Sequence, residues 1–151
     1  MDALTLLRRD HSAVRALFNK FDRLSKTDHD EISELFAEIR RELQLHSKAE
    51  EQIFYPALKA LNGAGACLAS QALEKHNEID SLLIRLSRLK PGGKSFDEHF
   101  ETLIDTVDCH IEEEEGEIFQ FAEENCSEQQ LEDLGRQIED RRTLLDRQMA
   151  A

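Results

Sequence analysis

The chain has 151 residues, of which 40% are hydrophobic, and a formal net charge of −13. This length suits one compact domain with its own core and is short for two. The negative charge argues against nucleic acid or an anionic membrane surface as a partner, because both attract Lys and Arg, and it suits a protein that binds cations. The sequence has no apolar run of the roughly 18 residues that a membrane span needs, and its N-terminus lacks the apolar core of a signal peptide. We therefore expect a cytoplasmic protein without a membrane or nucleic-acid partner.

Apolar residues recur every three or four positions along most of the chain, a pattern that predicts α-helices rather than strands. The first predicted helix runs from about Leu4 to Ser25 and has His11 on its apolar face. A polar stretch at 26–31 supplies capping residues and forms the first loop. The second predicted helix starts near Ile32.

This second helix continues to about Ile53 and places both His46 and Glu50 on its apolar face. A glutamate is unusual at such a position, because a buried carboxylate is costly unless it is paired. Pro56 disfavours helical geometry in the residue before it, so we expect a kink or an end there.

The third predicted helix follows a stretch that contains two glycines, 61–66, which we expect to be a flexible connection. Apolar residues at helical spacing from Leu68 to Leu86 mark this helix, and His76 lies on the same face. The stretch 90–95, which contains a proline and two glycines, ends it.

The fourth predicted helix begins with a capping box formed by Ser95 and Glu98. It reaches Phe121, and its apolar face carries His110 and Glu114. These two residues repeat the spacing of the histidine and glutamate on the second helix.

A second capping box, Ser127 with Gln130, opens a fifth amphipathic helix over 127–148. The predicted fold is therefore all-α. It is an up-down-up-down four-helix bundle over residues 1–125 with an additional C-terminal helix within 126–151, which either packs on the bundle or serves in association.

One short phrase occurs twice: "HSKAEEQIF" at 46–54 and "HIEEEEGEIF" at 110–119. Each copy starts with a histidine, has glutamates four and five residues later, and closes on Ile-Phe. The second copy has one extra residue, near Gly116, and we expect it to shift the helical phase there.

The histidines and glutamates of the apolar faces are spaced so that they can meet. The first and third helices each carry one inward histidine, and the second and fourth each carry a His-x3-Glu pair. In an antiparallel bundle the four histidines can lie at one level, and each glutamate lies about one helical turn beyond its histidine on the same face. Six side chains able to bind metal therefore converge on the bundle axis.

A hydrogen-bonded core residue is the ordinary interpretation of a single inward histidine. The two glutamates favour a different interpretation, since facing carboxylates in one core repel each other and take up protons unless a cation holds them. No basic residue shares these faces. A dinuclear metal centre resolves the conflict, because the carboxylates then compensate the charge of the ions.

The pattern formed by His11, "HSKAEEQIFYP", "EKHNEID" and "HIEEEEGEIF" resembles the hemerythrin-like, or HHE cation-binding, domain family over roughly residues 1–125. The resemblance implies a four-helix bundle around a non-haem di-iron centre. It implies that Glu50 and Glu114 bridge the two irons and that His11, His46, His76 and His110 are terminal ligands.

The sequence departs from the oxygen-carrying members of that family. They have a second histidine four residues after the third-helix histidine, where this chain has Asp80, and an aspartate where it has Glu115. With two carboxylate bridges, an oxo or hydroxo bridge and two histidines per iron, each iron would keep one open position unless Asp80 or Glu115 fills it. Imidazole and carboxylate ligands suit iron without excluding manganese or zinc. Glu51, Glu115, Asp80 and Tyr55 are expected to lie around the ligands rather than among them.

We therefore predict a non-haem di-iron protein that binds or reacts with a small oxidant or diatomic gas: O2, NO or peroxide. Whether it turns such a molecule over as an enzyme is left open by the sequence. One alternative is a redox, oxygen or iron sensor that signals through the C-terminal helix to a protein partner or a second subunit. Another is iron storage or buffering.

Overall fold

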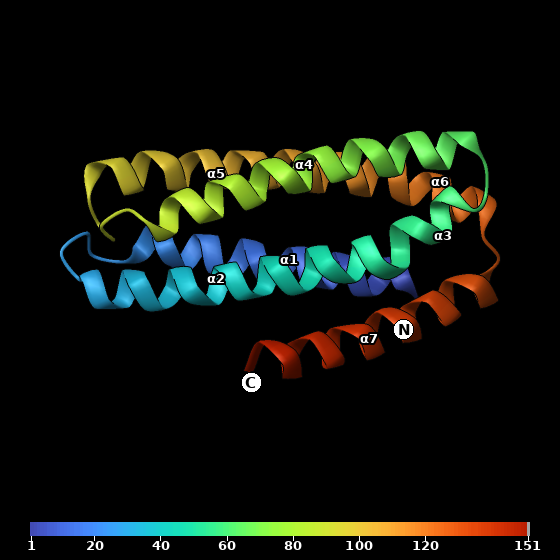
Figure 1. The fold of residues 1–151 in the computed structure, drawn as a ribbon, viewed down its shortest axis with the longest axis horizontal. Coiled ribbons are helices and arrows are strands. Elements are labelled where there is room, and N and C mark those ends of the chain that lie inside the picture. The colour runs from blue at the N-terminus through green and yellow to red at the C-terminus, as the bar shows by residue number, and fades with distance from the viewer. Residues whose placement is uncertain (151) are drawn as a thin grey trace.

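The computed structural model of the chain describes residues 1–150 and confirms the all-α prediction. Four long helical rods run antiparallel as two hairpins, and a further helix lies along the outside of one hairpin (Figure 1). No helix in the described part of the chain is both long and apolar enough to cross a membrane.

The rods have the following bounds. The first rod is α1 (Ala3–Arg23), and the second consists of α2 (His29–Ala49), a π-helical turn η1 (Glu50–Phe54) and α3 (Tyr55–Lys59). The third rod is α4 (Gly63–Ser87), and the fourth consists of α5 (Lys94–Glu113), a second π-helical turn η2 (Glu114–Ile118) and α6 (Phe119–Asn125). The outer helix is α7 (Glu128–Ala150).

The two π-helical turns lie at corresponding places in the repeated phrase. Each begins at the glutamate of the His-x3-Glu pair, and their first residues, Glu50 and Glu114, are 64 residues apart. The phase shift expected near Gly116 in the second copy is present, and the first copy, for which no shift was predicted, contains one as well. A π-helical turn accommodates one more residue than an α-helical turn, and both copies contain one.

This shift changes which residues enter the core after each glutamate. In the first copy Phe54 and Tyr55 are buried whereas Ile53, expected in the core, is half-buried. Pro56 does not end the rod, because the π-helical turn makes Tyr55 the first residue of α3 and so places the proline in a first turn, where its missing N–H costs little. The rod continues to Lys59.

The ends of the other helices follow their capping residues. The stretch 61–66 is largely helical rather than flexible, since the Asn62 side chain accepts hydrogen bonds from the first turn of α4. The Ser95–Glu98 capping box does not form, because α5 already starts at Lys94. The box at α7 does form, with Ser127 N donating to Gln130 Oε1 at 2.7 Å and Gln130 N donating to Ser127 Oγ at 3.1 Å.

Two apolar clusters fill the bundle and leave a polar layer between them. One cluster lies toward the α3–α4 connection and includes Leu7, Phe54 and Phe119. The other lies toward the α4–α5 connection and includes Val14, Phe100 and Val107. The inward histidines fall between the two clusters along each rod, so the predicted ligands occupy the middle of the core.

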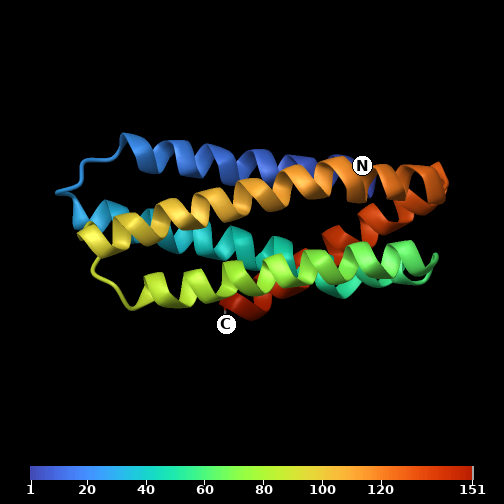
Figure 2. The same ribbon diagram turned by 90° about the horizontal axis from the view of Figure 1, so that it is seen from above.

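Helix α7 packs across α1, α2 and η1 (Figures 1 and 2). Its apolar face buries Leu131, Leu134, Ile138 and Leu145. At Gly135 a side chain would not fit, because a Cβ atom there would lie 2.3 Å from the carbonyl oxygen of Met1. The α1–α2 hairpin is thus covered on its outer side, whereas the described chain has no corresponding helix over α4 and α5.

Candidate metal centre

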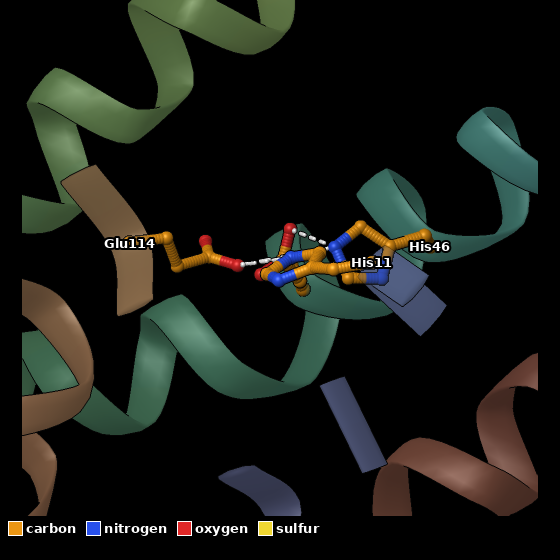
Figure 3. Close-up of side chains that lie close together, drawn as sticks. His11, His46 and Glu114 are labelled. Carbon is orange, nitrogen blue, oxygen red and sulfur yellow. Dashed lines mark hydrogen bonds and ion pairs between the residues drawn. The ribbon is translucent and has the colours of Figure 1, made fainter. Parts of the chain in front are cut away.

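Six histidine and glutamate side chains meet inside the bundle, and they are the six predicted from the sequence. His11 comes from α1, His46 and His76 from α2 and α4, and His110 from α5, while Glu50 and Glu114 open the two π-helical turns. All six are at most 5% exposed to solvent. Figure 3 shows His11, His46 and Glu114 pointing toward one another from three different rods.

The six side chains form two sets of four donors. His11 and His46 belong to one set and His76 and His110 to the other, and both sets share Glu50 and Glu114. Within each set, one ligand atom from every residue lies within 4.8 Å of the others. We call these sets the first and second half-sites. Two cations bridged by the shared carboxylates are the arrangement that such a donor set fits.

Several atoms of this cluster lack the hydrogen bonds that buried polar atoms normally have. His46 Nε2 and both carboxylate oxygens of Glu50 are inaccessible to solvent and make none, although His46 Nε2 lies 3.0 Å from Glu50 Oε1. A nitrogen and an oxygen that lie this close without a hydrogen bond are arranged as two ligands of one metal ion would be. The residues therefore fit a metal centre.

Two further carboxylates hold histidines from outside the cluster, as expected for Glu51 and Glu115. Glu115 Oε2 lies 2.8 Å from His11 Nδ1, and Glu51 Oε2 lies 2.9 Å from His76 Nδ1. A carboxylate on Nδ1 fixes the ring and its tautomer so that Nε2 is left for a metal.

A third such carboxylate, Asp10, was missed from the sequence. Its Oδ2 lies 3.0 Å from His46 Nδ1, and its Oδ1 accepts a hydrogen bond from Arg142 of α7 at 2.5 Å. Burial alone would raise the pKa of Asp10, but the hydrogen bond to His46 and the charges of His46 and Arg142 hold it below its ordinary value. The available signal was its spacing, since Asp10 lies at helical distance from Leu7 and Val14 on the apolar face of α1.

Tyr55 is in direct contact with the cluster. Its hydroxyl donates a hydrogen bond to Glu114 Oε2 and lies 3.3 Å from His76 Nε2. Burial and the neighbouring Glu114 and Glu50 carboxylates raise its pKa well above the usual value, so the hydroxyl keeps its proton. The residue 64 positions later is Phe119, which stacks on His11 with ring centroids 6.0 Å apart. A phenol thus borders the second half-site where a phenyl ring borders the first.

Asp80 does not join the cluster. It is exposed, makes no hydrogen bond to the six candidate ligands within residues 1–150, and lines a surface pocket with Glu51 and Ser47. Desolvation and the nearby Glu51 raise the pKa of Asp80.

Without a cation, the cluster holds negatively charged and positively charged groups side by side. Burial would raise the pKa of Glu50, but the charge of the neighbouring His46 holds it well below the usual value. Burial would likewise lower the pKa of His76, but the Glu50 carboxylate, 3.2 Å from its Nε2, and the hydrogen bond to Glu51 raise it to about 9. In the metal-free protein, protons on the histidines therefore take over part of the role of the cations.

This arrangement predicts a pH-dependent stability for the metal-free protein. The pKa of His76 is higher in the folded chain, about 9, than its ordinary value of 6.5, so its protonation stabilises the fold below pH 6.5 and that stabilisation is lost as the pH rises to 9. We expect the melting temperature of the metal-free protein to fall between pH 6.5 and 9, measured by circular dichroism. A His76→Gln variant should show a smaller fall, and equal falls in both proteins would contradict the assignment to His76.

Comparison with known proteins agrees with this geometry. The sequence profile of the hemerythrin HHE cation-binding domain matches residues 2–122. The fold resembles the crystal structure of an HHE domain-containing protein of Mycobacterium kansasii, the Rv2633c homolog, with a TM-score of 0.83, 23% identity, and coverage of 95% of this chain and 86% of that one.

Two curated proteins illustrate the range of its relatives. The uncharacterised protein Rv2633c of Mycobacterium tuberculosis is 27% identical over 138 residues, which cover 89% of this chain and 81% of that protein. A Nostoc protein named DNA nickase is 28% identical over 132 residues, which cover 87% of this chain but 36% of that longer protein. Because the family profile spans most of the chain and includes all six residues of the buried cluster, this chain belongs to the hemerythrin HHE cation-binding domain family.

Proposed function

We propose that the chain is a non-haem di-iron protein that reacts with a small oxidant or diatomic gas, either peroxide, NO or O2. The observation that carries the proposal is the pair of half-sites that share Glu50 and Glu114. Each half-site offers two imidazoles and two shared carboxylates, a donor set that suits iron and leaves coordination positions for a small molecule. Bound iron would supply redox chemistry and a site for that molecule.

The surrounding residues hold the donors in place and supply a proton. Glu51, Glu115 and Asp10 fix three of the four imidazole rings through Nδ1. The hydroxyl of Tyr55 holds a proton at the edge of the second half-site, 3.3 Å from His76 Nε2. A reactant that enters this half-site would therefore meet the Tyr55 hydroxyl, which would have to turn its proton from Glu114 Oε2 toward the reactant.

A surface cavity leads toward the second half-site. It has a volume of about 270 Å³ and is lined by His110 together with Lys75, Gln71 and Glu113. Its lining has four glutamates and one lysine, and this net negative charge disfavours anions and leaves neutral molecules such as peroxide and NO as suitable reactants.

The proposal is tested by anaerobic reconstitution with ferrous iron, followed by rapid mixing with peroxide or NO. We expect close to two irons per chain. If the reaction takes up a proton, the absorption change on mixing should be at least about tenfold faster in the unaltered protein than in a Tyr55→Phe variant. Reconstituted protein that reacts with neither and only releases iron slowly to a chelator would replace the proposal by iron storage.

A sensing role is the second candidate, and the contact of α7 with the centre through Arg142 and Asp10 favours it. In that case oxidation of the irons should change the association of the chain with itself or a partner. Sedimentation of the reduced and oxidised proteins separates this role from turnover, which leaves the assembly unchanged.

A further inference from the structure

Two side chains connect the C-terminal helix to a candidate metal ligand. Arg142 Nη1 of α7 donates a hydrogen bond to Asp10 Oδ1 at 2.5 Å, and Asp10 Oδ2 lies 3.0 Å from His46 Nδ1. Asp10 is 6% exposed and His46 5%. The connection therefore runs from a half-buried arginine into the centre of the bundle without an intervening gap.

Arg142 is held at its other end as well. Its second amino group hydrogen-bonds Glu42, which lies one turn before His46 on α2. The guanidinium thus joins α1, through Asp10, to α2, through Glu42. A planar group that binds two carboxylates at once has little freedom to reorient, so it fixes the position of Asp10.

The other half of the bundle has no such connection. The residue that precedes His76 on α4 is Lys75, whereas the residue that precedes His11 on α1 is Asp10. Lys75 pairs with Glu78, at 3.6 Å, and no carboxylate in residues 1–150 lies on Nδ1 of His110. The cavity beside His110 is lined by residues of α4, α5 and η2, whereas α7 covers the equivalent helices α1 and α2 in the other half of the bundle.

We propose that Arg142 is a positioning residue for His46: through Asp10 it holds that ring with Nε2 facing the centre, so the first half-site retains its metal ion more tightly than the second. Removing the guanidinium leaves the Asp10 carboxylate buried without its cation and free to turn away from His46. Outer-shell partners of this kind typically change metal affinity by about 10- to 100-fold. The proposal rests on metal binding at the centre and does not depend on which reactant the irons meet.

The test is the release of iron from the reconstituted full-length protein to an excess of a ferrous chelator, followed by absorbance. We expect two phases in the unaltered protein. In Arg142→Leu the slower phase should accelerate by about 10- to 100-fold while the faster phase stays the same. Arg142→Lys keeps the charge and should recover part of the slow phase. Arg141→Leu is the matched control, because the one side-chain hydrogen bond of Arg141 within residues 1–150 goes to the exposed Gln52, and both phases should be unchanged.

A double-mutant cycle separates positioning from a general loss of packing. In an Asp10→Asn background, Arg142→Leu should add little to the release rate, because the connection is already broken. The melting temperature of the metal-free Arg142→Leu protein shows whether α7 still packs. A single release phase in the unaltered protein, equal acceleration of both phases, or independent effects of the two substitutions would each overturn the proposal. If the unaltered protein still binds two irons in any of these cases, only the positioning role of Arg142 fails and the proposed di-iron function is retained.

Discussion

Replacing Glu50 by Gln should reduce the iron content from two ions per chain to one at most. Glu50 belongs to both half-sites and is fully buried, so its loss removes a ligand from each ion and one negative charge from between them. Gln keeps the size of the side chain and limits the packing effect. Glu114→Gln should behave alike, and iron analysis after anaerobic reconstitution and gel filtration measures both.

The control lies in the same acidic stretch as Glu114. Glu112 is exposed and two residues from Glu114, so Glu112→Gln makes the same change in net charge without touching the centre. It should keep both ions. Equal losses in the buried and exposed variants would show that iron binds to the acidic surface rather than inside the bundle.

Removing the metal should lower the melting temperature by an amount on the order of 15–30 °C. Each ion present at about 1,000 times its dissociation constant stabilises the fold by about 4 kcal/mol, and about 1 kcal/mol shifts the melting temperature of a chain of this size by about 2–4 °C. The effect is large because the ligands lie between the two apolar clusters, so the ions bind to the folded core. Calorimetry before and after chelation measures it.

The same measurement on the Glu50→Gln variant provides the comparison. A variant that binds at most one ion should lose about half as much or less on chelation. If the unaltered protein melts at the same temperature with and without metal, the ions do not bind at the polar layer between the clusters, and the candidate centre is wrong.

The sequence predicted which six side chains meet in the core because their signal is local. His46 with Glu50, and His110 with Glu114, each lie on one face of one helix, and a repeated spacing shows in the sequence without knowledge of the fold. The carboxylates Glu51 and Glu115 were placed near the ligands for the same reason. The capping box at Ser127 was confirmed because it is local: the side chains of Ser127 and Gln130 each accept a hydrogen bond from the other's backbone N–H.

What the sequence could not supply depends on packing between distant segments. Asp10 is 132 residues from Arg142, and no local pattern joins them. The π-helical turn at Glu50 was also missed. Periodicity assumes that each residue rotates by the same angle around the helix axis, and a π-helical turn changes that angle locally. Whether Asp80 fills a coordination position was left open by the sequence, because helical spacing gives the direction of a side chain only to within part of a turn.

The position of α7 also bears on where the folding unit ends. The family profile stops at residue 122, but four apolar residues of α7, among them Ile138, are buried against the α1–α2 hairpin. A fragment cut at that family boundary would expose the apolar surface that α7 covers, and surfaces of this kind promote aggregation. It would also leave Asp10 without its arginine. The smallest piece of this chain that keeps Asp10 paired with Arg142 is therefore longer than the domain by which the family is recognised.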